Sequence, residues 1–375
     1  MSTLGLYLHI PFCVKKCNYC DFLSFSAKEA LKDEYVKALA MEMRLWKDKV
    51  SNDVVDTIFI GGGTPSLLTE GQFDVLQNEM VKSFHLSDKM EYTIECNPGT
   101  VDGEKLKNYK KAGVNRISFG LQSTISSELA CLGRIHSYDD FLVSFHQARE
   151  CGFTNINVDL MSAIPEQTVA GYEQTLTRVC ELSPEHISSY SLILEEGTPF
   201  YEKYGDCPPV SEEEDRQMYE LTKEKLSDFG YHRYEISNYA KEGKECEHNK
   251  KYWKRFPYLG LGLGASSCMQ NVRFSNERNF KTYGQKIKNG KLPVVEKEEL
   301  TKEDCMAEFM YLGLRMMEGV SKKMFYQNFL VPMETYYQSS LEKCIREGLI
   351  KENGDRYCLT DFGIDVSNRV FAEFI

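Results

Sequence analysis

Short apolar runs alternate with amphipathic stretches through the first two thirds of the chain, at a spacing of roughly 30 residues. This rhythm is typical of βα units arranged around a parallel sheet. We expect six of the runs to be strands, which predicts an α/β fold with a partial (β/α)6 barrel. The predicted strands span residues 5–10, 54–60, 91–95, 116–121, 155–160 and 188–194.

The amphipathic stretches between the runs predict helices. Two of these helices are preceded by capping signals, which are Thr69-x-x-Gln72 and Ser137-x-x-Asp140. The acidic run at 212–215 also predicts a helix start rather than a metal site, because carboxylates favour the positive end of a helix dipole. The clearest helical patterns span residues 34–46, 71–84 and 138–151.

From about residue 300 the pattern changes to helices followed by a short hairpin, with Asn353-Gly354 as the tight turn. This order resembles a winged helix, so we expect a smaller C-terminal α+β domain with a winged-helix-like module. Its charges are mixed and its expected recognition helix has no basic cluster, which favours a protein-facing or structural role over DNA binding. The predicted helices span residues 303–317, 322–329 and 334–348.

The chain has 375 residues, more than one compact domain usually holds. We therefore expect a barrel at 1–235, a linking segment at 236–299 and the C-terminal domain at 300–375. The formal net charge of −11 at pH 7 argues against nucleic acid as a principal partner, because phosphate binding requires a basic surface.

The sequence contains no apolar run of about 18 residues. Its start, MSTLGLYLHIPF, is short and lacks the basic flank of a signal peptide. We therefore expect a soluble cytoplasmic protein, for which peripheral contact with a membrane stays open.

Cys13, Cys17 and Cys20 lie in one short loop after the first apolar run, in a C-x3-C-x2-C spacing. Thiolates hold iron–sulfur clusters, and four of them complete the ligands of a [4Fe–4S] cube. Here the local set stops at three, because Phe22 stands where a fourth close cysteine would fit. One iron would therefore lack a protein ligand. This pattern resembles that of radical S-adenosylmethionine (SAM) proteins, in which the open iron chelates SAM and passes an electron to its sulfonium.

Other interpretations of the cysteines are weaker. Structural zinc sites use four ligands in paired spacings, and no second pair lies at a suitable distance. Disulfides are possible among 13 cysteines, but those outside the loop are scattered through periodic segments, where reduced core cysteines usually lie. A purely structural cluster would not need an open iron.

Polar residues mark the carboxyl ends of the predicted strands. They are the GGGTP run at 61–65, Glu95, Gln122 and Asp159. In βα barrels this rim carries the active site, because its loops converge over the mouth. Glycines allow a ligand to approach the main chain. Glu95 can meet an ammonium, Arg134 a carboxylate and Asp159 a ribose hydroxyl pair, and SAM offers all three.

Nearly the whole chain resembles the coproporphyrinogen III oxidase-like branch of radical SAM proteins, through the cysteine loop, GGGTP, IECNP, FGLQS, LGRIHS and NVDLM. The resemblance implies that Cys13, Cys17 and Cys20 are the cluster ligands. The SAM contacts that it implies are Tyr7, Tyr19, Gly62, Gly63, Thr64, Glu95, Gln122, Arg134 and Asp159. One departure is SAIPEQT at 162–168, where the family more often has a glycine-containing YGLPGQT; it falls on the loop after Asp159.

Three features separate the heme chaperones of this branch from the oxidase. The oxidase has a fourth cysteine where Phe22 stands, and it has an N-terminal extension, whereas Cys13 lies near the start of this chain. The third feature is HNKKYW, an H-N-x-x-Y-W sequence that resembles the characteristic motif of the HemW family. The heme contacts that this motif implies are His248, Asn249, Tyr252 and Trp253.

The resemblance therefore implies a HemW-like heme chaperone that binds heme, a [4Fe–4S] cluster and SAM, and delivers heme to respiratory membrane enzymes. The alternative is an oxygen-independent coproporphyrinogen III oxidase, which decarboxylates a porphyrinogen in heme biosynthesis. SAM cleavage is compatible with the first function and required by the second. We do not expect oxidase activity.

The H-N-x-x-Y-W stretch has a physical interpretation of its own. Histidine is a common axial ligand of heme iron, and Tyr252 and Trp253 could cover a porphyrin edge. The thiolate of Cys246 competes with His248 as the ligand. In the plainer interpretation these are ordinary residues of a domain-joining loop. The glycine-rich stretch at 259–265 predicts a close-packed turn back to the barrel.

Overall fold

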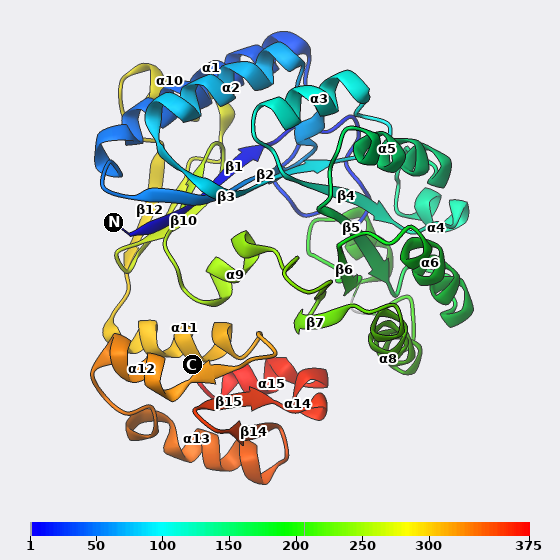
Figure 1. Ribbon diagram of the computed structural model, residues 1–375, viewed down its shortest axis with the longest axis vertical. Helices are drawn as coiled ribbons and strands as arrows, with labels where there is room; N and C mark the ends of the chain where they lie inside the picture. Colours follow the sequence, from blue (N-terminus) through cyan, green and yellow to red (C-terminus); the bar gives the residue numbers. More distant parts are fainter. Residues whose placement is uncertain (1, 206) are drawn as a thin grey trace.

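The computed structural model describes residues 2–205 and 207–375, and in them one twelve-stranded sheet curves around the interior of the molecule (Figure 1). Its strand order is β12-β11-β10-β9-β1-β2-β3-β4-β5-β6-β8-β7. The strands from β9 to β6 in this order run parallel. They are β9 (Tyr258–Leu261), β1 (Thr3–Ile10), β2 (Val54–Gly62), β3 (His85–Cys96), β4 (Arg116–Gln122), β5 (Ile156–Ser162) and β6 (His186–Ser191).

All six predicted strands are present, with shifted ends. β3 begins at His85, before the predicted residue 91, and β6 ends at Ser191, before the predicted residue 194. Alternate side chains of the parallel strands face the barrel interior, as Ser118 and Gln122 do in β4. The polar residues predicted to form a site therefore share one inward surface.

Helices cover the outer face of the parallel strands (Figure 1). Their apolar sides pack on the outward residues of the strands in one large core, which includes Leu39 and Phe141. Complete capping boxes begin three of these helices, at Thr69, Ser137 and Ser211, which confirms the predicted helix starts. The helices are α1 (Glu29–Trp46), α2 (Glu70–Ser83), α3 (Gly103–Lys111), α5 (Tyr138–Glu150), α6 (Val169–Glu181) and α8 (Glu212–Asp228).

The segment 236–299, expected as a link between domains, is itself built into the sheet. The glycine-rich stretch at 259–265 starts as β9, in which Gly260 is the register partner of Tyr7 in β1, and turns only at Gly262, whose φ is +99°. The other strands of the sheet are β7 (His232–Glu235), just before this segment, β8 (Asn238–Ala240), β10 (Ser266–Met269), β11 (Val272–Asn276) and β12 (Val294–Glu299), and α10 (Phe280–Lys288) precedes β12.

A buried carboxylate fixes this segment to α1. The Oε2 atom of Glu42 accepts hydrogen bonds from the N–H of Gly262 (2.8 Å) and the hydroxyl of Tyr283 (2.6 Å), and Oε1 accepts one from Nδ2 of Asn276 (2.7 Å). Burial raises the pKa of Glu42 to about 7. The three donors replace the hydration that the carboxylate loses.

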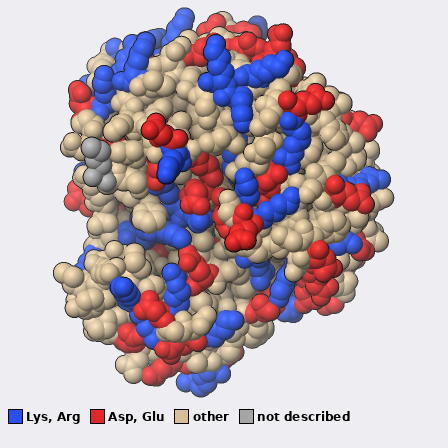
Figure 2. Space-filling model, viewed as in Figure 1, with Lys and Arg blue, Asp and Glu red and all other residues tan. Residues whose placement is uncertain are grey.

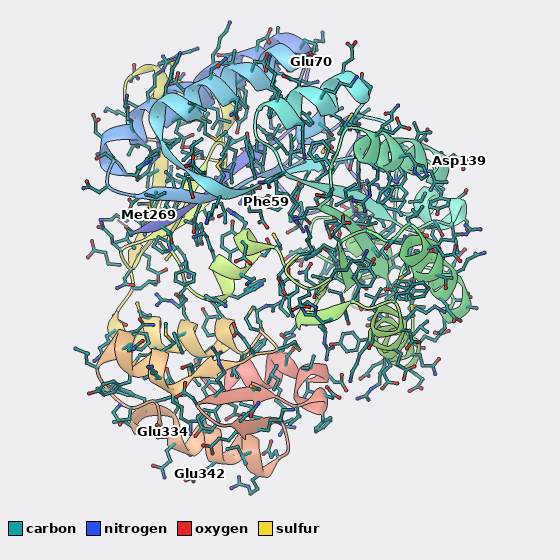
Figure 3. All side chains as sticks on the ribbon, in the orientation of Figure 1. Phe59, Glu70, Asp139, Met269, Glu334 and Glu342 are labelled. Carbon is teal, nitrogen blue, oxygen red and sulfur yellow. The ribbon has the colours of Figure 1, made fainter. Side chains whose placement is uncertain are left out.

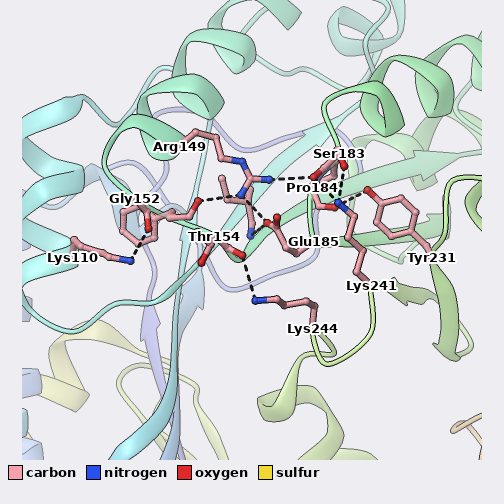
Figure 4. Close-up of polar contacts among 12 residues, drawn as sticks. Lys110, Arg149, Gly152, Thr154, Ser183, Pro184, Glu185, Tyr231, Lys241 and Lys244 are labelled. Carbon is pink, nitrogen blue, oxygen red and sulfur yellow. Dashed lines mark hydrogen bonds and ion pairs between the residues drawn. The ribbon is translucent and has the colours of Figure 1, made fainter.

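Side-chain donors hold the loops at the amino ends of the strands (Figure 4). Arg149 pairs with Glu185 at 2.8 Å and donates to the carbonyl of Ser183 at 3.2 Å. Lys241 donates to the same carbonyl at 2.9 Å. These bonds satisfy main-chain acceptors near helix ends, so this rim stabilises the barrel.

A short helix, α9 (Glu247–Trp253), lies inside the curve of the sheet (Figure 1). Glu91 of β3 caps it, because Oε2 accepts the N–H of Glu247 and Oε1 accepts the N–H of His248, each at 3.0 Å. Phe59, labelled beneath the sheet in Figure 3, stacks on the His248 ring at 5.4 Å between centroids. The H-N-x-x-Y-W stretch is therefore a helix in the barrel interior and not a domain-joining loop.

The C-terminal elements form a second hydrophobic core around Phe325 and Leu341. Their order confirms the winged-helix-like module, although its first helix ends at Gly313 and not at residue 317. Asn353 pairs with Arg356, so the hairpin loop is one position later than predicted. The elements are α11 (Lys302–Gly313), β13 (Val320–Ser321), α12 (Lys322–Phe329), α13 (Glu334–Arg346), β14 (Ile350–Asn353), β15 (Arg356–Leu359), α14 (Asp361–Asp365) and α15 (Ser367–Ala372).

An ionic contact joins this domain to the barrel. Glu308 of α11 is 4% exposed and pairs with Arg255, at 2.7 Å, and with Arg273 of β11. Acidic and basic side chains are interspersed on the face that Figure 2 shows. In the parts that the structure describes, no helix combines the length and the apolar character needed to cross a bilayer.

Candidate functional site

The barrel interior holds a cavity of about 740 Å³ that extends from the cysteine loop to α9. All three cysteines and all nine residues predicted to contact SAM line this cavity. Of the four motif residues, His248, Asn249 and Tyr252 line it, whereas Trp253 does not. The fold therefore brings together nearly all of the predicted site residues, which come from five strands, from loops that follow them and from α9.

The cysteine loop is held by main-chain bonds to its neighbours. The N–H of Cys13 donates to the carbonyl of Phe25 (3.1 Å), and the N–H of Asn18 donates to that of Leu132 (3.0 Å). α4 (Ser126–Cys131) and α7 (Pro199–Tyr204) flank the loop, and the N–H of Phe200 in α7 donates to the carbonyl of Asn18 (3.0 Å). The three thiols are thereby presented from a braced loop at the cavity mouth.

All three thiols are free and half-buried. Burial raises the pKa of Cys20 to about 11, and the neighbouring Cys17 adds to this shift. Within the described residues, no three His, Cys, Asp or Glu side chains converge on one point as ligands of a single ion do. An iron–sulfur cluster binds each thiolate to a different iron, so its ligands need not converge in that way, and this donor set fits a cluster.

The GGGTP run is bonded within the protein. The N–H groups of Gly63 and Thr64 donate to the carbonyls of Ile10 (2.8 Å) and Phe12 (2.7 Å). A Cβ on Gly63 would lie 2.7 Å from the carbonyl oxygen of Phe12, and one on Gly62 would lie 2.5 Å from the His9 ring. These glycines therefore let the end of β2 pack against the start of the cysteine loop, in addition to any contact with a ligand.

Glu95 and Asp159 are two buried carboxyl groups that line the cavity and interact electrostatically. Glu95 accepts the N–H of Gly62 at 3.1 Å, and burial together with the charge of Asp159 raises its pKa to about 8. Asp159 accepts Nδ2 of Asn157 at 2.7 Å, and burial raises its pKa. A ligand ammonium near Glu95 would favour its ionised form.

Arg134 connects the cysteine loop to β4. Its Nη1 lies 3.6 Å from the sulfur of Cys17, and its Nη2 donates to Oδ1 of Asn97 (2.9 Å) and to the carbonyl of Gly120. Nε is buried without a partner among the described residues. The guanidinium can therefore stabilise the thiolate of Cys17, a role that sequence reasoning did not assign to it.

The remaining predicted SAM contacts, Tyr7, Tyr19 and Gln122, are fixed by burial or by hydrogen bonds to neighbouring side chains. Tyr7 OH lies 3.0 Å from Nδ1 of His9, and burial raises the pKa of Tyr7. Burial also raises the pKa of Tyr19. Gln122 has a φ of +73° at the end of β4 and accepts the hydroxyl of Tyr190 at 3.2 Å.

His248 is 1% exposed, and both of its ring nitrogens are hydrogen-bonded. Nδ1 lies 2.9 Å from the hydroxyl of Thr57, and Nε2 lies 2.8 Å from that of Tyr252. Burial, and then the charges of Lys251 and Arg116, lower the pKa of His248 to about 3. Ligation of an iron by His248 would require one of these hydrogen bonds to break.

The other motif candidates differ in their surroundings. The guanidinium carbon of Arg315 lies 4.3 Å from the ring centroid of Trp253, so Trp253 faces the C-terminal domain. Cys246 is fully buried, 3.5 Å from Oε1 of Glu91, and burial raises its pKa to about 12. The side chain of Asn249 faces the cavity and forms no hydrogen bond with any residue that the structure describes.

The loop at 162–168 contains two residues in the left-handed backbone conformation that glycine usually adopts, although neither residue is glycine. Ala163 (φ +57°) and Glu166 (φ +67°) stand where the family pattern YGLPGQT has its glycines. Replacing the two glycines has therefore not changed the left-handed backbone conformation at these two positions. This conformation costs about 1–2 kcal/mol at each residue with a Cβ.

Sequence reasoning missed several cavity residues. Arg116 and Ser118 precede Gln122 on the inward face of β4, and Phe59 lies inward on β2. Their signal was the two-residue period of a strand, which extends the inward surface from a strand's end back to its start. Arg278 follows β11 and carried no such signal.

Comparisons with known proteins agree on the superfamily. The model of the radical SAM superfamily matches residues 7–179, and the model of the HemN C-terminal domain matches residues 300–366. The "Heme chaperone HemW" of Bacillus subtilis is 39% identical over 98% of this chain and 98% of that protein. The "Heme chaperone HemW" of Escherichia coli K12 is 34% identical over 100% of this chain and 99% of that protein.

Among solved structures, coproporphyrinogen III oxidase (HemN) from Escherichia coli, described as a radical SAM enzyme, matches with a TM-score of 0.89. The match covers 100% of this chain and 90% of that one at 23% identity. At this identity the match shows the fold alone, and it confirms the predicted partial barrel with its C-terminal domain.

Proposed function

This chain belongs to the HemW heme chaperone family of the radical SAM superfamily, and from that membership we propose that it binds a [4Fe–4S] cluster, SAM and heme and passes heme to respiratory membrane proteins. The observation that carries the proposal is the shared cavity, which the cysteine loop lines at one end and the H-N-x-x-Y-W helix at the other.

Cys13, Cys17 and Cys20 would hold the cluster, with Arg134 beside the sulfur of Cys17. The cluster together with SAM supplies one-electron chemistry. The polar residues that line the cavity would hold and orient SAM, with Glu95 and Asp159 as acceptors and Arg134 as donor. Tyr7 and Tyr19 would contribute aromatic and polar contacts beside them.

Heme is the cargo in this proposal. His248, Asn249 and Tyr252 would meet it from α9, and Trp253 would support α9 from behind. His248 and Cys246 are the two candidates for the axial ligand. Both are buried and hydrogen-bonded, so ligation by either would be accompanied by a local shift of α9.

Anaerobic reconstitution followed by paramagnetic resonance tests the cluster and SAM. We expect a [4Fe–4S] signal in the reduced protein that shifts when SAM is added, and loss of the cluster in Cys17→Ser with the barrel still folded. Cys131→Ser is the matched control, because Cys131 is a half-buried cysteine beside the loop and outside the cavity. An unchanged spectrum at saturating SAM, with the full cluster present, would contradict the open iron.

Heme titration followed by optical spectra tests the cargo. We expect the wild type to bind heme and His248→Ala to bind it most weakly. If Cys246→Ala loses heme while His248→Ala keeps its affinity and Soret band, the ligand is Cys246. If no variant and no wild-type sample binds heme, the chaperone function is wrong.

An activity assay separates the proposal from the oxidase alternative. Phe22 occupies the position of the oxidase-type cysteine, so we expect no conversion of coproporphyrinogen III to protoporphyrinogen IX. Two successive decarboxylations at sustained turnover would favour the oxidase. Transfer of bound heme to membrane vesicles that contain heme-free respiratory enzymes would test delivery.

A further inference from the structure

The barrel interior contains a buried guanidinium without a partner. Arg116 is 1% exposed and lines the cavity, and its Nε atom has no hydrogen-bond partner among the described residues. In the parts that the structure describes, no carboxylate forms an ion pair with it. A buried charge of this kind costs several kcal/mol unless something compensates it, so its position requires an explanation.

The carboxyl groups whose charges act on Arg116 are engaged elsewhere. Glu91 caps α9 with both oxygens, Glu95 accepts the N–H of Gly62, and Asp159 accepts Nδ2 of Asn157. Because burial raises the pKa of Glu95 to about 8, this group carries little negative charge near pH 7. The guanidinium therefore keeps its hydrogen-bonding capacity for another anion.

A second polar side chain, which has no hydrogen-bond partner among the described residues, lines the same cavity. This side chain is Asn249 of α9, which follows His248. The charge of Arg116 contributes to the lowered pKa of His248, so Arg116 lies near this part of α9. Asn238 also lines this cavity, and its buried Oδ1 has no hydrogen-bond partner in the part of the chain that the structure describes. Unsatisfied polar groups that line one cavity are typical of a site that a ligand or ordered water completes.

We propose that Arg116 and Asn249 form a carboxylate-binding subsite at the inner end of the cavity, and that it takes a propionate of heme. Arginine binds carboxylates through two parallel N–H donors, and an asparagine amide can add a third. This inference rests on the proposed function, and it gives the H-N-x-x-Y-W helix a role in holding heme by its carboxylate. SAM also carries a carboxylate, so the test distinguishes the two sources.

The experiment compares hemin with hemin dimethyl ester, which keeps the iron and macrocycle but lacks both carboxylates. The reconstituted wild type should bind hemin on the order of ten- to a hundred-fold more tightly than the ester, because this is the affinity that hydrogen bonds to a charged group contribute. Asn249→Ala and Arg116→Gln should lose that preference while their affinity for the ester stays unchanged. SAM affinity, measured by equilibrium dialysis, should not change in either variant.

Lys250→Ala is the matched control, because Lys250 lies on α9 but lines a different cavity on the other side of the helix. Asn249 is only half-buried, so its alanine variant keeps the test decisive if Arg116→Gln does not fold. Loss of SAM affinity with unchanged hemin affinity would assign the subsite to SAM. Unchanged affinity for both ligands would overturn the subsite and leave ordered water as the partner of these groups. If the wild type binds neither form of hemin, the heme function fails, and the SAM measurement alone decides the subsite.

Discussion

The hydroxyl of Tyr252 lies 2.8 Å from Nε2 of His248, one helical turn earlier in α9. The two rings also meet edge to face, with centroids 5.1 Å apart. Thr57 holds the other ring nitrogen, so the first and fifth residues of the H-N-x-x-Y-W motif form one buried hydrogen-bonded chain with β2. The spacing of histidine and tyrosine in the motif is therefore the spacing that an α-helix requires for this contact.

Tyr252→Phe should lower the free energy of unfolding by about 1–3 kcal/mol, because it leaves Nε2 of the buried His248 without a partner. Denaturant unfolding measures this change. Tyr258→Phe is the control: Tyr258 packs on Tyr252 at 4.6 Å between centroids, but its hydroxyl makes no hydrogen bond with the residues that the structure describes. Equal effects of the two substitutions would show that the hydroxyl bond contributes nothing.

The low pKa of His248 predicts a pH dependence of stability. Its pKa is about 3 in the folded protein, against about 6.5 in the unfolded chain. Between these values the unfolded chain binds a proton that the folded chain does not. The contribution of His248 to the free energy of unfolding is therefore fully present above pH 6.5. It is lost as the pH falls toward 3, by up to about 1.4 kcal/mol per pH unit.

His248→Asn removes this contribution. The difference in unfolding free energy between pH 7 and pH 5 should shrink by about 2 kcal/mol relative to the wild type. The other buried histidines are present in both proteins, so their effects cancel in the comparison. The same pH dependence in both proteins would mean that folding does not lower the pKa of His248.

Local patterns predicted much of the fold and most of the site. The capping boxes at Thr69 and Ser137 are contained in four consecutive residues each, and the six strands follow from short apolar runs. The inward set of Glu95, Gln122 and Asp159 was visible because each residue lies at or near the end of an apolar run that predicts a strand, and parallel strands align their carboxyl ends. In the structure β5 continues for three residues beyond Asp159.

Features that depend on distant pairing could not be predicted in this way. β9 pairs with β1 across about 250 residues, so the sequence near Gly260 shows only a turn-like composition. α9 is capped by Glu91 from β3, and its own N-cap residue, Cys246, gives no capping signal. Arg116 was overlooked because the expected site was confined to the strand ends, whereas the inward surface continues to the strand starts.

Ala163→Gly should raise the free energy of unfolding by roughly 0.5–1 kcal/mol. The left-handed conformation costs a residue with a Cβ about 1–2 kcal/mol, and the added freedom of glycine in the unfolded chain offsets part of this gain. Ala130→Gly is the control, because Ala130 is an exposed residue of α4, where the same exchange costs about 1 kcal/mol. A loss of stability in both variants would contradict the backbone conformation at Ala163.

Glu308→Ala should weaken the attachment of the C-terminal domain. Glu308 is buried between Arg255 and Arg273, and its removal leaves both guanidinium groups unpaired where the domain meets the barrel. Breaking such a pair costs about 3 kcal/mol or more, and here Arg273 remains partly hydrated, so we expect a loss near the lower value. Urea unfolding measures the loss, and limited proteolysis should show faster cleavage near residue 300.

Glu303→Ala, on the exposed start of the same helix, should change stability by no more than about 1 kcal/mol through the helix dipole. If Glu308→Ala and Glu303→Ala unfold alike and resist protease equally, the buried ion pairs do not hold the domain, and the contact of Arg315 with Trp253 becomes the main candidate for that role.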